Sequence, residues 1–309
     1  MSESIRKIYD LILKRALELS PGAVVGFING LYDESLPVSD VEVIYTATES
    51  ISDDLGYTFS DKMLTIRSNN MQRRFHIEAE ITSNDEEIVL RVFDYGYMDA
   101  LRNKSIKNGV ITLSFPQPKI IYLEHWSTAP DEVTLKLDFW GQGTSKYTVP
   151  TMKFLDYSVE ELEKRNMVIL LPLYLLKLRR KIEAAKAKGT VGKYTEDMRT
   201  LLNEDILGTL TRHVDAGKIT RRDAHILLKL LNRLYNHLYG EVNEFKNKGV
   251  KDMVDERLLL ENELEVLEAV ENVAKELLLE NVNITTIAKT TKLSLERVME
   301  IQESMTVPV

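Results

Sequence analysis

The 309-residue sequence contains no cysteine. This absence excludes disulfide scaffolds, zinc sites with thiolate ligands and cysteine nucleophiles, and it agrees with a reducing cytoplasm. Long apolar runs are missing as well, because the most apolar stretch, residues 167–176, has ten residues and contains Pro172. A membrane-spanning helix needs about 20 apolar residues. We therefore expect a cytoplasmic protein without a transmembrane helix and without a membrane partner.

Positive charge is in deficit. The chain has 40 Lys and Arg against 48 Asp and Glu, a net charge of −8, and residues 1–152 hold 15 basic against 22 acidic residues. A protein that binds DNA by charge alone usually has a broad positive face. A DNA-directed function would therefore depend on local basic patches or on metal ions that offset the acids.

The chain changes character near residue 155. Before it, short strand-like runs are separated by turn signals such as PQP and GQGTS, and helical periodicity appears at the N-terminus and over residues 85–102. After it, leucines recur at helical spacing, and Ser158 with Glu161 forms a capping box that predicts the start of a long helix. The predicted organisation is an α/β (α+β) domain over residues 1–155, a helical region over 156–280 and a small tail over 281–309.

Three acidic residues, Asp61, Glu78 and Glu80, lie in a segment that predicts two antiparallel strands. Asn69 and Asn70 suit a two-residue loop between them, because asparagine tolerates the left-handed backbone conformation. This loop places Asp61 opposite Glu78, and Glu80 shares their face because strand side chains alternate. The same register gathers an apolar set on the opposite face: Leu64, Ile66, Phe75, Ile77, Ala79 and Ile81.

Three adjacent carboxylates repel one another unless a positive group lies between them. Mg²⁺ (or Mn²⁺) suits such a site, because it prefers oxygen ligands and keeps waters that can act as a nucleophile. The residues alone leave an alternative open, in which the acids form the solvated polar face of an edge hairpin.

The next segment predicts a helix that begins with a second capping box, Ser83 with Glu86. Arg91, Tyr95 and Arg102 follow at spacings that place them on one helix face. Arg91 is a candidate phosphate ligand because a guanidinium can hold two phosphate oxygens at once. Tyr95 is a candidate to support Arg91 or to donate a hydrogen bond to an acid.

Two alternatives accompany these candidates. Arg91 could instead pair with Asp94 or Asp99 on a surface helix. His76 shares the strand face of Glu78, where it is a candidate contact for DNA or the leaving group, and the alternative is an imidazole that is simply exposed.

The tail has helix-turn-helix spacing, with Ser294 as the N-cap of the second helix. Base contacts would fall to Arg297 and Gln302, and the alternative is a helical cap or a dimer contact. The leucine-rich residues 256–280 indicate packing or self-association.

The motifs FSDKMLTI, RRFHIEAEI and LRVFDYGYMDAL, followed by the apolar runs up to LLPLYLLKLRR, occur in an order that resembles the recombination-promoting nucleases, a transposase-like family of the PD-(D/E)XK superfamily. The resemblance covers roughly residues 20–180. It implies a restriction-endonuclease-like core in which Asp61 and Glu78 hold the metal and Glu80 is the third catalytic residue. Glu80 departs from the Lys or Gln that is usual there.

What the resemblance implies is a Mg²⁺-dependent DNA endonuclease that hydrolyses phosphodiester bonds, linked to recombination or mobile elements. The catalytic and metal-binding set would be Asp61, Glu78 and Glu80, and the expected partners are DNA and a second copy in a homodimer. The alternative is a catalytically inactive relative that acts as a DNA-binding or protein-interaction module.

Overall fold

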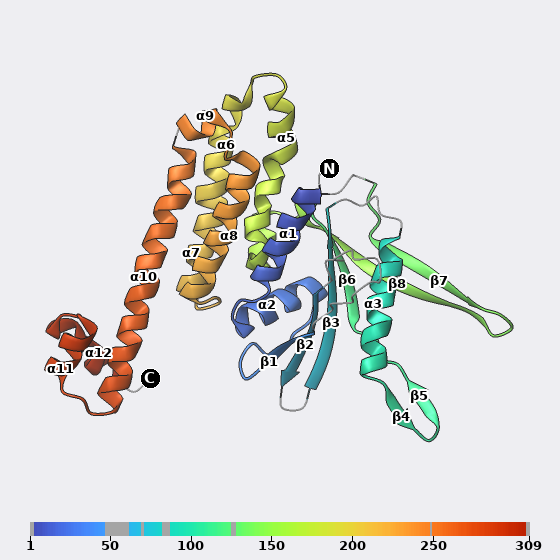
Figure 1. The fold of residues 1–309 in the computed structure, drawn as a ribbon, viewed down its shortest axis with the longest axis horizontal. Helices are drawn as coiled ribbons and strands as arrows, with labels where there is room; N and C mark the ends of the chain where they lie inside the picture. Colours follow the sequence, from blue (N-terminus) through green and yellow to red (C-terminus); the bar gives the residue numbers. More distant parts are fainter. Residues whose placement is uncertain are drawn as a thin grey trace. The chain divides into compact units, whose positions relative to one another are not determined.

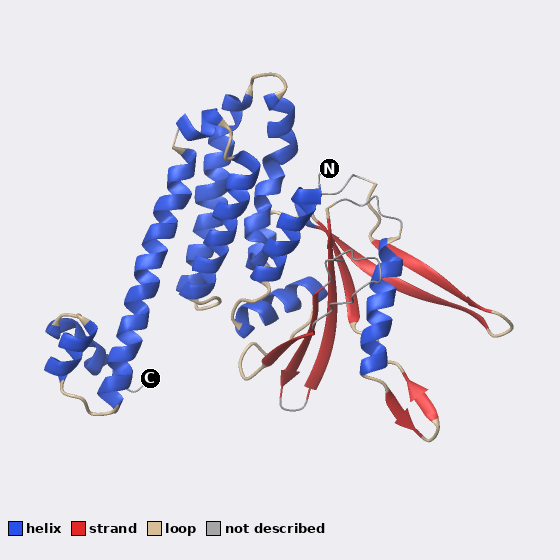
Figure 2. Ribbon diagram, in the orientation of Figure 1, coloured by secondary structure: helices blue, strands red, loops and turns tan. Residues whose placement is uncertain are grey.

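The computed structural model describes residues 3–46, 62–68, 71–81, 87–124, 128–247 and 249–306. The chain forms two compact units, residues 1–251 and residues 252–309. The first unit begins with a mixed six-stranded sheet and its helices and continues as a largely helical region (Figures 1 and 2). The predicted fold class is confirmed.

The sheet has the strand order β1-β2-β3-β6-β8-β7. Its middle pairs, β3 with β6 and β6 with β8, are parallel, and the other neighbours are antiparallel. A separate two-stranded hairpin, β4–β5, lies between α3 and β6 in the chain. The strands are β1 (Glu42–Thr46), β2 (Lys62–Ser68), β3 (Met71–Glu80), β4 (Ser105–Lys107), β5 (Val110–Thr112), β6 (Gln117–Tyr122), β7 (Glu132–Phe139) and β8 (Gly143–Lys153).

The α-helices of the first unit are α1 (Glu3–Ala16), α2 (Pro21–Tyr32), α3 (Ile88–Arg102), α4 (Val159–Lys164), α5 (Leu176–Lys186), α6 (Thr195–Thr200), α7 (Gly208–Asp215), α8 (Arg221–Tyr239) and α9 (Asn243–Asn247). Three 3₁₀ segments (Phe154–Asp156, Val168–Leu175 and Val191–Tyr194) and one π segment (Leu201–Leu207) connect them. Helix α10 (Val250–Leu279) crosses the boundary between the units.

The predicted register of β2 and β3 is confirmed, because Lys62 pairs with Ile77 and Leu64 with Phe75. The predicted apolar face is buried except for Ala79, which is half-buried. The Phe75 ring lies 4.8 Å from the Tyr32 ring of α2. Helix α2 therefore packs on this face, and alternation leaves the other face of β3 for the acids.

The capping box at Ser158 and Glu161 is present, with hydrogen bonds of 3.1 and 2.7 Å between the two residues. The long helix predicted after it is wrong, because α4 ends at Lys164. Asn166 takes the left-handed conformation, with φ of 57°, and Pro172 cannot donate a helical hydrogen bond. The apolar run at residues 167–176 does not continue a helix but contains a buried 3₁₀ segment, Val168–Leu175.

A buried ion pair connects the sheet to the helical region of the first unit. Glu124, just after β6, accepts hydrogen bonds from Arg179 of α5 and, at 3.4 Å, from Arg180. Arg179 also contacts the hydroxyl of Tyr9 at 3.3 Å, and burial raises the pKa of Tyr9 above its ordinary value. Glu124 and Arg179 are 2% and 6% exposed, so their charges depend on each other.

In the second unit, α11 (Ile284–Thr291) and α12 (Leu295–Thr306) pack on α10 around a small apolar cluster. The side chain of Ser294 accepts a hydrogen bond from the Arg297 amide at 3.1 Å, as predicted for an N-cap. The Arg297 side chain pairs with Glu271 at 2.8 Å and Glu300 at 2.7 Å. These ion pairs favour the helical cap over base recognition by Arg297.

None of the helices in the described parts of the chain combines the length and the apolar character needed to cross a membrane.

Candidate functional site

The two glutamates of the predicted site lie at the C-terminal end of β3. Glu78 and Glu80 are next to Ile120 and Tyr122 of the parallel strand β6. Helix α3 covers this face, where Val92 packs with Ile120 and Tyr122. The acids are consequently 5% and 7% exposed. The alternative of a solvated face on an edge hairpin is wrong, because β3 is an interior strand and α3 lies over its acids.

Arg91 of α3 joins the two carboxylates. Its Nη2 atom lies 2.7 Å from Oε1 of Glu78 and 3.1 Å from Oε2 of Glu80. The other oxygen of Glu80 accepts a hydrogen bond from the Ile81 amide at 3.0 Å. One nitrogen can contact both carboxylates only if their oxygens lie close together. The positive group that the acids require is thus a guanidinium in this structure.

The structure describes both alternative partners of Arg91, Asp94 and Asp99. Asp99 pairs with Arg74 of β3, and it also accepts a hydrogen bond from Asn103. Asp94 is exposed. Arg91 itself is half-buried against the sheet, whereas Arg102, predicted on the same helix face, is exposed at the end of α3.

His76 is fully buried beneath α3. Its ring meets the ring of Tyr95 edge-on, with centroids 6.3 Å apart. The alternative in which His76 is simply exposed is wrong, because α3 covers the face that it shares with Glu78. A contact between His76 and DNA would require this imidazole to become accessible. Tyr95 is half-buried and lies one helical turn after Arg91.

Asp61, the third predicted acid, lies outside the described residues, and so do Asn69, Asn70, Ser83 and Glu86. The confirmed register reaches Lys62, which pairs with Ile77, one position before the predicted partners. The pairing of Asp61 with Glu78 stays a prediction.

No protein-family model, curated protein or solved structure matches the chain. The resemblance to the PD-(D/E)XK nucleases consequently remains a prediction from the sequence motifs.

The donor chemistry of the site fits Mg²⁺ or Mn²⁺. Glu78 and Glu80 offer carboxylate oxygens, which these ions prefer, at a point that already holds a positive group. Within the described ranges, no group of three acidic, histidine or cysteine side chains could hold a metal. A complete site would therefore need a further ligand, for which Asp61 is the candidate, and Arg91 would have to share the carboxylates or leave them.

Sequence reasoning missed a further acid, Glu124, at the same end of strands β3 and β6. The amide of Leu123 donates to the Glu80 carbonyl at 2.8 Å, and the amide of Glu124 donates to the Ile81 carbonyl at 2.6 Å. Glu124 therefore continues the β3–β6 ladder beside the site. The available signal was an acid directly after the apolar run KIIYL. Because Arg179 and Arg180 already pair with its carboxylate, we assign Glu124 a structural role beside the site.

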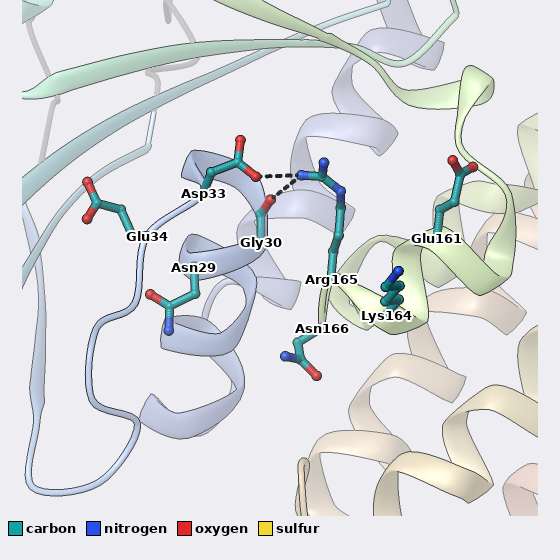
Figure 3. Close-up of a pocket in the computed structure, with 8 residues that line it drawn as sticks. All are labelled: Asn29, Gly30, Asp33, Glu34, Glu161, Lys164, Arg165 and Asn166. Atoms are coloured by element: carbon teal, nitrogen blue, oxygen red, sulfur yellow. Dashed lines mark hydrogen bonds and ion pairs between the residues drawn. The ribbon is translucent and has the colours of Figure 1, made fainter.

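A polar hollow of about 580 Å³ lies elsewhere, between the end of α2 and α4 (Figure 3). Arg165 crosses it and donates to Asp33 at 2.9 Å and to the Gly30 carbonyl at 3.2 Å. None of the candidate site residues that the structure describes lines it, so we assign it no ligand. Its lining residues are Asn29, Gly30, Asp33, Glu34, Glu161, Lys164, Arg165 and Asn166.

We expect replacement of Arg91 by methionine to make the fold depend on divalent cations. Without the guanidinium, two buried carboxylates lose their counter-charge, and the free energy of unfolding should fall by about 3 kcal/mol in EDTA. Millimolar Mg²⁺ or Mn²⁺ should then raise the melting temperature more than in the wild type, because the ion no longer competes with Arg91 and stabilises the folded state by mass action.

Arg102→Met is the matched control, since it removes an exposed arginine from the same helix. Thermal melts with and without metal would measure the effect. Equal metal-induced shifts in the wild type and both variants would show that the ion does not bind at Glu78 and Glu80.

Proposed function

We propose that the chain is a metal-dependent DNA endonuclease that hydrolyses phosphodiester bonds at Glu78 and Glu80. The observation that supports this proposal most strongly is the composition of the buried cluster, two carboxylates and one guanidinium. Apolar residues would usually stabilise an interior as well or better. Two buried carboxylates that converge on one guanidinium suit a site that binds a cation.

Each side chain has a role in this proposal. A bound Mg²⁺ or Mn²⁺ would stabilise negative charge on the phosphate. Glu78 would hold the ion, with Asp61 as the predicted second ligand. Glu80, oriented by the Ile81 amide, would join them or accept a proton from the attacking water. Arg91 shifts from the glutamates to hold phosphate oxygens, and Tyr95 packs against His76.

A second function is favoured by one observation. Arg91 already neutralises part of the charge on the glutamates, and Glu80 stands where Lys or Gln is usual in the resembled family. In this alternative the chain is an inactive relative that binds DNA or a protein partner without cleaving it.

The proposal includes a homodimer. Helix α10 exposes apolar side chains at seven-residue spacing, which is the repeat of coiled coils. A second copy of the same helix would cover this stripe, and two copies would present two sites for the two strands of a duplex. The exposed residues are Leu259, Leu260, Val266, Leu267 and Val273.

Nicking of supercoiled plasmid DNA tests the proposal. The purified chain should convert supercoiled to open-circular DNA with Mg²⁺ or Mn²⁺ and leave it intact in EDTA, because the carboxylates alone cannot stabilise the charge that develops on the phosphate. Absence of nicking with both ions would contradict the nuclease and leave the inactive relative as the better explanation.

A further inference from the structure

A basic hairpin follows the C-terminal end of α3. Residues 102–112, RNKSIKNGVIT, contain three basic residues and no acid, in a chain whose net charge is −8. Arg102, Lys104 and Lys107 are all exposed. None of the three forms an ion pair with a residue that the structure describes. We call residues 102–112 the basic arm.

The basic arm is a regular β-ribbon. Strands β4 and β5 pair antiparallel, and Asn108 and Gly109 connect them with φ angles of 52° and 76°. Two central residues with positive φ make the tight hairpin turn that matches the twist of the strands. Figure 1 shows this hairpin extending from the C-terminal end of α3 and away from the six-stranded sheet.

The two faces of the ribbon differ in chemistry. Ile106 lies opposite Ile111 on one face, and the two side chains are 65% and 60% exposed. Lys107 lies opposite Val110 on the other face, where Val110 is 63% exposed. Apolar side chains flanked by unpaired positive charge suit a nucleic acid, because phosphates attract the charges while bases and sugars accept the apolar contacts.

The base of the arm is fixed to the sheet. Arg74 of β3 pairs with Asp99 before the hairpin and donates to the Ser114 carbonyl after it. Phe115, next in the chain, stacks on Phe93 of α3 with ring centroids 5.6 Å apart. Contacts on both legs hold the ribbon in a defined direction, as a binding element requires.

The base of the arm and the carboxylates lie at different points along β3. Glu80 follows Arg74 by six positions, a distance of roughly 20 Å along an extended strand. This length corresponds to about six base pairs of duplex DNA. A duplex whose backbone lies at the Glu80 end of β3 would therefore reach the base of the arm about half a helical turn away, and a two-stranded ribbon fits the major groove.

We propose that the basic arm binds duplex DNA, with Arg102, Lys104 and Lys107 on phosphates and the two isoleucines in a groove. The inference rests on the proposed DNA substrate and adds the element that positions it. It also explains how an acidic chain binds DNA, since the arm supplies local positive charge in a region, residues 1–152, that holds 15 basic against 22 acidic residues.

Binding in EDTA tests the arm without cleavage. The full chain is titrated into a fluorescent duplex about three helical turns long, and anisotropy is recorded between about 50 and 200 mM salt. The double variant Lys104→Ala/Lys107→Ala should bind roughly 10-fold more weakly, and the slope of log affinity against log salt should fall by about 2, because two phosphate contacts are lost. Ile106→Ser/Ile111→Ser should weaken binding with the slope unchanged, since no counterion release is involved.

Lys186→Ala/Lys188→Ala is the matched control, because it removes two exposed lysines at the end of α5. Equal losses in both lysine variants, or no loss in the arm variant, would overturn the arm. So would a wild type that fails to bind duplex DNA, or one that binds only polyglutamate, which would indicate an acidic protein partner. DNA binding that depends on the arm, without nicking, would contradict the proposed nuclease and support the arm. Nicking at the same rate in the wild type and the arm variants would support the nuclease and contradict the arm.

Discussion

Glu78→Ala should reduce metal-dependent nicking by about 10²-fold or more, the scale expected when a positioned catalytic group is lost. Glu78 is in direct contact with Arg91 and on the face that Asp61 is predicted to share. Its removal would take away the proposed metal ligand and one of the two carboxylates that contact Arg91. Rates of plasmid nicking with Mn²⁺ measure the change, and circular dichroism checks the fold.

Glu132→Ala controls for the loss of one acid, since Glu132 is exposed on β7. The two proposed roles of Glu80 are separated by Glu80→Gln, which keeps hydrogen bonding and removes charge. Activity should persist in this variant if Glu80 orients water and disappear if it accepts the proton, while Glu80→Ala should be inactive in both cases. Nicking that survives unchanged in Glu78→Ala would place the activity at another site.

Glu124→Ala should lower the free energy of unfolding by about 3–5 kcal/mol. The substitution leaves Arg179, which is 6% exposed, without its buried carboxylate. Isolating a buried charge costs far more than losing a surface pair, because the charge keeps its desolvation penalty and loses its partner. Urea denaturation followed by circular dichroism measures this difference.

Glu183→Ala is the control on the same arginine. Glu183 is the half-exposed partner of Arg179, at 2.9 Å, and its loss should cost about 1 kcal/mol or less. The double variant Glu124→Leu/Arg179→Met should recover part of the stability, because it removes both charges together. Similar losses for Glu124→Ala and Glu183→Ala would show that the buried pair does not hold the sheet to the helices.

The sequence predicts the local pairing well and the burial of the site poorly. The β2–β3 register follows from the alternation of Leu64, Ile66, Phe75 and Ile77, because a slip by one residue would expose all of them. The burial of Glu78 depends on where α3 packs, which is a tertiary property. Alternation along β3 is the same whether its polar face meets water or a helix.

Other differences have similar causes. The capping box at Ser158 sets where α4 begins, but its end depends on the left-handed conformation of Asn166. One of the strand-like runs in the first half of the sequence, VITLSF at residues 110–115, predicts a single strand, whereas the structure gives β5 only Val110–Thr112, paired with β4. The Asn108–Gly109 dipeptide was the available signal for that hairpin. The partners of Arg91 could not be predicted, because spacing along a helix does not identify what lies opposite it.

The parallel pairing of β3 with β6 has a consequence for the order of folding. Strands β2 and β3 pair across a short connection, and so do β7 and β8, so both hairpins can form from local contacts. The parallel pairing of β3 with β6, which begins with Phe75 and Gln117, closes a longer loop that contains α3 and the arm. Because a longer loop costs more entropy to close, we expect this pairing to form after the hairpins. Glu78 and Glu80 would remain on an open sheet edge until β6 docks. The carboxylate site is therefore expected to appear late in folding, so that in a partly folded chain Glu78 and Glu80 are still exposed and the proposed cation site is not yet formed.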